Sequence, residues 1–312
     1  MITFDKIKIV APLGVVRIIE RDKFEIIQGG GRLKSIKKTL TTPFYLSMEL
    51  NYQSGEFIME FTGKVLGERY PELISKETIL ECFDKINELG YCIVDKEKIM
   101  HATVVKCDVT KDIPVEDFSG LTNWLRGNVV SYQKYNCRQL RNGNLIVEKN
   151  VSSHKRKKRI TIYNKEQEMG TRKEREYVST NGLEDKFSGL CRFELNLTSQ
   201  AQIRDALGIT GNTLAEVLNA DKNPIADFVE DIICDGHDNA YPKDHSWKTY
   251  QKVAILKDCN YDIEQVEARL REYYDPSRTS IVTKLRPYRE LLKGKGCNDH
   301  SWTKQKLLAA LD

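Results

Sequence analysis

Two short segments of this 312-residue chain carry the side chains best suited to chemistry. The first, RITIYNK, alternates apolar and polar residues, which predicts a β-strand with Tyr163 and Lys165 on one face. The second, CRFELNL, alternates in the same way and sets Arg192 and Glu194 opposite its apolar residues. Two such strands would form a polar sheet surface beside cationic sequence. This arrangement favours phosphate chemistry on a nucleic acid.

Tyr163 is the candidate nucleophile. A phenolate can attack a DNA phosphodiester and form a covalent phosphotyrosine, and Lys165 is placed to lower the tyrosine pKa or to hold the phosphate. The alternative is a tyrosine that packs its ring and hydrogen-bonds at a sheet edge. Other tyrosines remain open as nucleophiles: Tyr132 and Tyr135 lie on a predicted helix, and Tyr177 follows a basic loop.

Three carboxylates are candidate metal ligands. The β-branched run IMHATVVKCD ends at Asp108 and predicts a strand that emerges from the core with Asp108 and then Asp112 at its end, and Glu194 lies within the second polar strand. Carboxylates at such positions commonly bind Mg²⁺ or Mn²⁺, although most acidic residues are solvated surface groups. Glu194 is the stronger case, because its neighbours Phe193 and Leu195 are apolar and a carboxylate so placed needs a cation or hydrogen-bond donors.

Basic residues flank the RITIYNK strand on both sides, in HKRKKR before it and RKER after it. The net charge is only +4, so the position of these cations matters more than their number. A solvated loop is the default interpretation, but cations on both sides of one strand could form a continuous phosphate-binding face. The candidate DNA-binding residues are Lys155, Arg156, Lys157, Lys158, Arg159, Arg172 and Lys173.

Composition places the chain among globular proteins large enough to bury a core. The eight cysteines show no CxxC spacing, which argues against a zinc finger and favours reduced thiols in a cytosol. No signal peptide, lipidation motif or long apolar run is found. We therefore expect no membrane contact and a location in the cytoplasm of a bacterial host.

The hydrophobic pattern predicts an α+β protein. Residues 2–62 are expected to form antiparallel strands, Ser75 to Gly90 a helix, and 115–140 a mainly helical stretch. Asn142 to Asn144 is the strongest hairpin turn, with a return strand up to Val151. Beyond residue 212 helical patterns dominate. We expect an antiparallel catalytic domain over 1–210, flanked by helices, and a helical domain over 211–312 that contacts DNA or partners.

Four segments in order resemble a known family. FTGKVLGERYPELIS, CDVTKDI, ITIYNKEQE and CRFELNL are similar to landmarks of replication initiators of the filamentous-phage gene II type. They also resemble rolling-circle plasmid initiators, which have a YxK segment followed by an R-[FY]-E-L-R-L strand. The resemblance covers roughly residues 40 to 210, and the order of the segments is more specific than any one of them.

The resemblance implies a nicking and closing endonuclease. In that family a tyrosine attacks one strand at the replication origin, a divalent metal polarises the phosphate, and a released 3′-hydroxyl primes synthesis. It implies metal ligation by Asp108 and Glu194, less firmly by Asp112, and phosphate contacts by Lys165 and Arg192. Two departures stand out, since no tyrosine occurs in residues 166–169 and the paired histidines of the broader superfamily are missing.

Other functions fit the same features. A conjugative or mobilisation relaxase differs only in the steps after the nick. A sequence-specific DNA-binding regulator would use the basic residues without chemistry. A helicase of the host is a candidate additional partner of the initiator.

Overall fold

The computed structural model describes residues 2–129, 135–151, 158–233, 246–259, 263–274, 280–293 and 302–312. The chain forms two compact units. The first comprises Met1–Val115, Val151–Asp227 and Leu311–Asp312, and the second comprises Glu116–Asn150 and Phe228–Ala310. These units do not follow the expected division into 1–210 and 211–312, because an internal segment groups with the C-terminal helices. Local hydrophobic patterns carry no information about which distant segments associate.

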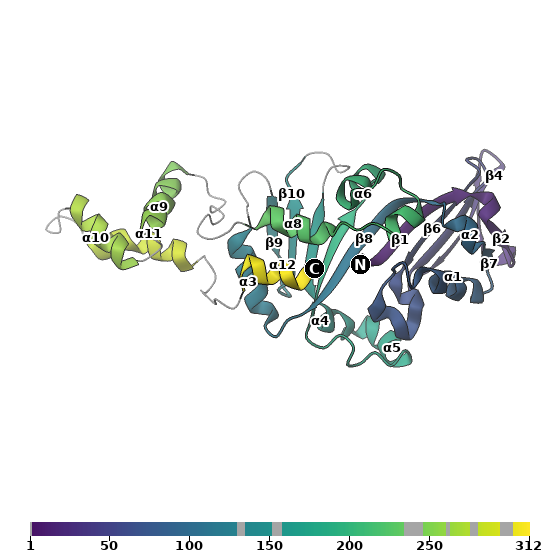
Figure 1. Ribbon diagram of the computed structural model, residues 1–312, viewed down its shortest axis with the longest axis horizontal. Helices are drawn as coiled ribbons and strands as arrows, with labels where there is room; N and C mark the ends of the chain where they lie inside the picture. Colours follow the sequence, from purple (N-terminus) through teal and green to yellow (C-terminus); the bar gives the residue numbers. More distant parts are fainter. Residues whose placement is uncertain are drawn as a thin grey trace. The chain divides into compact units, whose positions relative to one another are not determined.

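An antiparallel sheet forms the centre of the first unit (Figure 1). Eight of its strands follow the order β3-β4-β5-β6-β1-β8-β12-β11, so the first strand of the chain lies in the middle. These strands are β1 (Phe4–Pro12), β3 (Glu25–Gly29), β4 (Arg32–Leu40), β5 (Leu46–Asn51), β6 (Glu56–Thr62), β8 (Thr103–Pro114), β11 (Arg159–Asn164) and β12 (Leu190–Leu197). The short strands β2 (Val16–Ile18) and β7 (Cys92–Val94) pair separately.

The two faces of this sheet differ in polarity, as the alternation in β6 illustrates. Phe57, Met59 and Phe61 are fully buried, whereas the alternate residues Ile58, Glu60 and Thr62 are only partly buried. Successive side chains of a strand point to opposite faces, so one face contributes to the hydrophobic core and the other is polar. The polar face carries the residues singled out by the sequence.

Helices cover the sheet and its ends. The ring of Phe83 in α1 lies 6.0 Å from that of Phe61 in an edge-to-face contact, which places α1 on the apolar face. In Figure 1, α6 is drawn above the central strands and α4 and α5 below them. The first unit contains η1 (Leu13–Val15), η2 (Arg21–Lys23), η3 (Gly63–Glu72), α1 (Ile79–Glu88), α2 (Lys96–Ile99), α4 (Lys165–Met169), α5 (Arg172–Thr180), α6 (Gln200–Leu207) and α7 (Leu214–Leu218). The helix α8 (Pro224–Ile232) continues into the second unit.

The second unit combines a hairpin with helices. Its elements are α3 (Phe118–Asn128), β9 (Tyr135–Gln139), β10 (Leu145–Lys149), α9 (Trp247–Asp258), α10 (Ile263–Tyr273), α11 (Ile281–Lys293) and α12 (Lys304–Leu311). Leu256, Val266 and Leu285 belong to a cluster of buried side chains that holds α9, α10 and α11 together. In the described part of the chain, no helix is both long and apolar enough to cross a membrane.

The predicted fold class is confirmed, with an antiparallel sheet flanked by helices and a mainly helical C-terminal part. The strands expected within 2–62 and the hairpin at Asn142 to Asn144 are also present. The helical prediction for 115–140 is wrong at its end, where Tyr135–Gln139 forms β9. This segment pairs with β10 and buries Tyr135, so its cross-strand contacts override the local pattern.

Candidate active site

The candidate residues meet on the polar face of three neighbouring strands. Arg192 of β12 lies between Asp112 of β8 and Tyr163 of β11 in the strand register. Glu194 lies two residues later in β12 and therefore shares this face. Both aspartates lie on β8, which extends to Pro114, so Asp112 lies two residues from the end of the strand, whereas Asp108, also predicted at a strand end, lies in its interior.

Arg192 is the centre of a buried network of ion pairs. Its side chain has no exposed surface, and its Nε and Nη2 atoms each donate to one oxygen of Asp112 at 2.6 Å. Its Nη1 donates to Asp5 Oδ1 at 2.7 Å and to Tyr70 Oη at 2.9 Å. Burial raises the pKa of Asp5, but Arg192 and Lys165 outweigh that effect and hold it below its usual value. All charged groups of this network have partners.

Lys165 belongs to the same buried network. The expectation that it shares a strand face with Tyr163 is wrong, because β11 ends at Asn164 and Lys165 begins α4. The Asn164 side chain accepts a hydrogen bond from a backbone N–H of that helix and so caps it. The Lys165 Nζ donates to Tyr70 Oη at 2.8 Å and to Glu168 Oε2 at 2.7 Å. Burial, together with the nearby Arg192 charge, lowers the pKa of Lys165.

Tyr163 and Glu194 form the pair most suited to chemistry. The partly exposed Tyr163 donates its hydroxyl to Glu194 Oε2 at 3.2 Å. Burial raises the pKa of Tyr163 well above its usual value, so the neutral phenol needs a base in order to react. Burial also raises the pKa of Glu194 to about 7, with further contributions from the charges of Asp5 and Asp108. A carboxylate of that pKa is suited to accept a proton near neutral pH.

Asp108 is the second carboxylate of this region with a raised pKa. Burial is the main cause, the charge of Asp5 adds to it, and the Asn196 side-chain amide donates a hydrogen bond to the carboxylate. Both oxygens of Asp112 are already engaged by Arg192, so Asp108 and Glu194 are the remaining oxygen donors. Within the described residues, no three histidine, cysteine or acidic side chains converge as a preformed metal site. Two carboxylates nevertheless fit Mg²⁺, which commonly binds one or two of them together with substrate phosphates.

The predicted DNA-binding residues fall into four groups. Lys155, Arg156 and Lys157 lie outside the described residues. Lys158 forms an ion pair with Asp205 at 2.6 Å, whereas Arg159 is exposed. Arg172 and Lys173 are exposed in the first turn of α5. Arg192 is buried among acidic partners, so it contributes to the internal network described above.

The alternative tyrosines differ from Tyr163 in their surroundings. Tyr132 lies outside the described residues. Tyr135 is 3% exposed, and its hydroxyl lies 3.4 Å from Asp231, while burial raises its pKa to about 12. Tyr177 is 4% exposed, and its hydroxyl donates to the carbonyl oxygens of Lys64 and Gly67 at 2.8 and 3.2 Å. Both buried rings are held by internal contacts.

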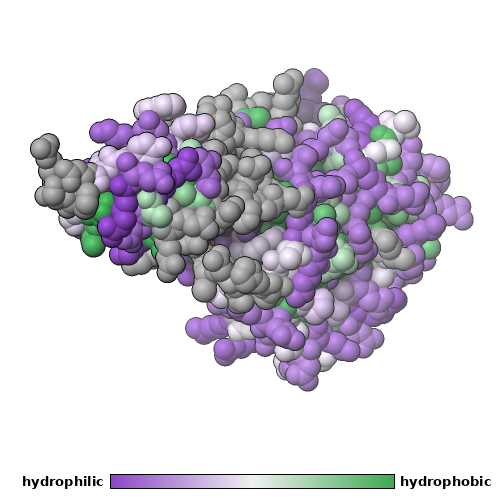
Figure 2. Space-filling model, turned by 60° about the vertical axis from the view of Figure 1, so that its left-hand side comes forward, coloured by the Kyte–Doolittle hydropathy of each residue, from purple (hydrophilic) through white to green (hydrophobic). Residues whose placement is uncertain are grey.

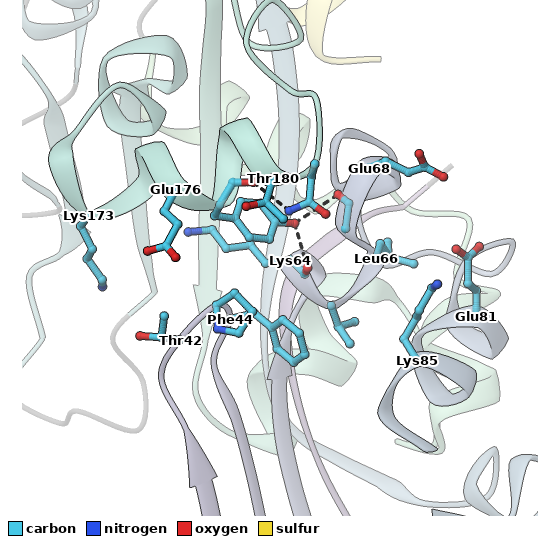
Figure 3. A pocket seen from close by; sticks show the side chains of 15 residues that line it. Thr42, Phe44, Lys64, Leu66, Glu68, Glu81, Lys85, Lys173, Glu176 and Thr180 are labelled. Carbon is cyan, nitrogen blue, oxygen red and sulfur yellow. Dashed lines mark hydrogen bonds between the residues drawn. The ribbon is translucent and has the colours of Figure 1, made fainter. Parts of the chain in front are cut away.

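A pocket of about 640 Å³ lies beside the network, between the turn before β5, η3 and α5 (Figure 3). Phe44 and Thr42 lie on one side and Glu176 and Thr180 on the α5 side. Its lining mixes lysines and glutamates, and Lys64 is already paired with Glu174 at 2.5 Å. This mixture gives no consistent charge for a single class of ligand.

Sequence patterns did not identify Asp5 and Tyr70 as members of this region. The sequence carries a signal for Asp5, because the consecutive polar residues Asp5 and Lys6 interrupt the alternation of β1. In the structure, the pairing of β1 with β8 is irregular at this point. Tyr70 gave no local signal, since its hydroxyl reaches Asp5 and Arg192 only after η3 has folded against the end of the sheet. Comparisons with protein-family models, curated proteins and solved structures find no match for this chain.

Proposed function

We propose that this protein is a DNA nickase of the rolling-circle initiation type, with Tyr163 as its nucleophile. The hydrogen bond from the Tyr163 hydroxyl to Glu194 carries this proposal. Of the tyrosine candidates within the described residues, Tyr163 alone is both partly exposed and bonded to a carboxylate with a pKa near 7. The sequence resemblance to replication initiators supports the same reaction.

In the proposed step, the Tyr163 oxygen attacks a backbone phosphorus and the P–O3′ bond breaks. Glu194 accepts the phenolic proton as the new O–P bond forms, which offsets the raised pKa of the phenol. The products are a 5′-phosphotyrosine and a DNA strand with a 3′-oxygen, which takes a proton from water. The closing reaction reverses these steps and returns the proton from Glu194.

Asp108 and the Glu194 carboxylate oxygen that does not accept the Tyr163 hydroxyl would hold Mg²⁺ or Mn²⁺. When bound, such an ion supplies positive charge to the phosphate oxygens of the transition state. Asp108 lies diagonally across from Glu194, because Asp108 pairs with Asn196 and Glu194 is two residues from Asn196. The charges of Asp5 and Asp108 contribute to the raised pKa of Glu194, and a bound cation would offset them.

The buried network has a positioning role in this proposal. Arg192 lies directly beside Tyr163 in the strand register and is fixed by two bonds to Asp112. Lys165 lies 5.8 Å from the Tyr163 ring centroid and is fixed by Tyr70 and Glu168. The phosphate contacts implied for Lys165 and Arg192 by the resemblance would require these buried ion pairs to open.

The test is relaxation of a supercoiled plasmid that carries the DNA surrounding the coding sequence. We expect nicked and relaxed product in the presence of Mg²⁺ or Mn²⁺, and none with the Tyr163→Phe variant. Tyr177→Phe is the matched control, because it removes a hydroxyl that bonds only backbone carbonyls. Bound DNA that remains supercoiled with either metal would contradict the nickase and favour a regulator. Nicking at a transfer origin, without support for replication, would favour a relaxase.

A further inference from the structure

Three lysines surround one glutamate on the polar face of the sheet, away from Tyr163. The Nζ atoms of Lys6, Lys106 and Lys8 lie 2.9, 3.6 and 3.7 Å from carboxylate oxygens of Glu60. We call Lys6, Lys8 and Lys106 the lysine cluster. Their side chains are 24%, 37% and 33% exposed, whereas that of Glu60 is 13% exposed. The cations are therefore more accessible than the anion that they share.

The lysine cluster has an excess of positive charge. Although burial raises the pKa of Glu60, the three lysines hold it below its usual value, so the carboxylate is ionised. Glu60 and the neighbouring Asp108, which faces Lys6 and Lys106, offset at most two of the three positive charges. Among the residues that the structure describes, Glu60 is the carboxylate within ion-pair distance of Lys8 and Lys106. Gathering three cations on neighbouring strands costs free energy unless an anion offsets the repulsion.

An aromatic ring lies at the edge of this cluster. The Lys6 Nζ lies 4.3 Å from the centroid of the Tyr45 ring, and the Tyr45 carbonyl accepts a hydrogen bond from the Thr62 backbone N–H. Thr62 pairs with Lys6, so Tyr45 continues the same row of side chains across the sheet. Tyr45 is partly exposed. Cations next to an accessible aromatic ring are the usual means of binding single-stranded nucleic acid, through phosphate contacts and base stacking.

We propose that the lysine cluster and Tyr45 form a binding site for the backbone and one base of single-stranded DNA. Strand β8 connects this site to Tyr163. Its Asp108 pairs with Lys6, and its Asp112 pairs with Arg192. Arg192 in turn pairs with Tyr163. Lys106 and Asp112 are six positions apart in β8, which corresponds to about 20 Å along the strand. That distance is about six phosphate steps at B-form spacing, and fewer for an extended strand.

The site would therefore hold the DNA strand several nucleotides from the bond that is cut. This placement rests on the proposed nickase function, but the binding itself does not. Arg159 extends the positive charge across this face, because it is exposed and belongs to the same row of paired residues as Lys6. In that row Lys6 pairs with Asp108, Asp108 with Asn196, and Asn196 with Arg159. Apart from the residues drawn in grey, the surface visible in Figure 2 is mostly hydrophilic, with apolar residues in small patches.

Binding of a fluorescent mixed-sequence oligodeoxynucleotide to the full chain, measured by anisotropy over a range of salt concentrations, tests this proposal. The main variant is Lys8→Gln with Lys106→Gln, which leaves Lys6 to pair with Glu60. We expect the log–log salt slope to fall by about 1.4 for two lost contacts, with roughly tenfold weaker binding at moderate salt. The matched control is Lys23→Gln with Lys98→Gln, which removes two exposed lysines that each pair with an acidic neighbour.

A second pair of variants tests the aromatic part. Tyr45→Leu should weaken binding by about fivefold or more, and Tyr45→Phe should bind like the parent, because stacking needs only the ring. Unchanged thermal unfolding shows that each variant is folded. All measurements are repeated in the Tyr163→Phe background, where binding should persist, so that failure of the nickase proposal remains distinguishable from failure of this one.

Three results would overturn the inference. The first is a salt slope of the double lysine variant equal to that of the control. The second is equal affinity for a duplex of the same sequence, which would remove the single-strand assignment. The third is displacement of the oligonucleotide by millimolar inorganic phosphate at constant ionic strength, which would indicate a site for a small anion.

Discussion

Two groups of charges on the same sheet face show opposite balances. Around Arg192, two buried cations, Arg192 and Lys165, face three partly exposed carboxylates, those of Asp5, Asp112 and Glu168. In the lysine cluster, three partly exposed cations share Glu60. The cations of the first group are shielded from solvent, whereas those of the lysine cluster are partly exposed.

This difference separates structural charge from charge that can bind a ligand. A buried cation with all its hydrogen bonds made has little left to offer a phosphate, and removing it leaves its partners uncompensated. An exposed cation with a shared partner contributes little to stability and retains capacity for an external anion. Tyr163 and Glu194 lie beside the first group, where a neutral phenol meets a carboxylate that is protonated more easily than usual.

The largest expected effect is that of Arg192→Met. It removes the guanidinium that compensates Asp5 and Asp112, so we expect a loss of about 3–5 kcal/mol in the free energy of unfolding. Urea denaturation measures this loss. Arg192→Lys keeps the charge but not the two-pronged contact with Asp112 and should lose less. A loss below about 1 kcal/mol for Arg192→Met would show that the group is not structurally required.

The second prediction concerns pH and Glu194. The folded pKa of about 7 lies above the unfolded value near 4.5, so the stability contributed by protonated Glu194 is full below pH 4.5 and is lost as pH rises through 7. We expect the free energy of unfolding to fall by on the order of 2 kcal/mol between pH 5 and 8 through this group. Glu194→Gln cannot titrate and should lack that part of the decline. An identical pH profile for both proteins would contradict the assignment.

The third prediction uses Tyr163→Phe as a structural probe. The lost hydroxyl stabilises the ionised form of Glu194 through a hydrogen bond, so its removal should raise the Glu194 pKa further. The pH-dependent decline in stability should shift to higher pH, with a change of about 1 kcal/mol or less in stability at pH 5. Thermal unfolding over a pH series measures the shift. A shift to lower pH would mean that the hydroxyl does not stabilise the carboxylate.

The smallest effect is expected in the lysine cluster. Lys8→Gln and Lys106→Gln should each change the free energy of unfolding by less than about 0.5 kcal/mol, because exposed ion pairs contribute little. The measurement is urea denaturation at low and high salt. If either variant were as destabilised as Arg192→Met, the distinction between the two groups would fail.

The sequence predicted the parts of this site that depend on local alternation. The β11 and β12 strands, with Tyr163 and Glu194 on them, follow from a period of two. The place of Lys165 does not follow from this period, because a single residue decides whether the strand continues or a capped helix begins. Tyr70 and the lysine cluster depend on pairing between segments far apart in the chain, for which the sequence has no local signal.

The most direct test of the central claim is mass spectrometry of the protein after reaction with DNA that carries the recognised origin. The account predicts a nucleotide adduct on the peptide that contains Tyr163, and no adduct in Tyr163→Phe. The variant should still bind the same DNA and keep near-parental stability, which separates chemistry from folding. An adduct on Tyr132, Tyr135 or Tyr177 in the parent protein, or one that persists in Tyr163→Phe, would contradict the account.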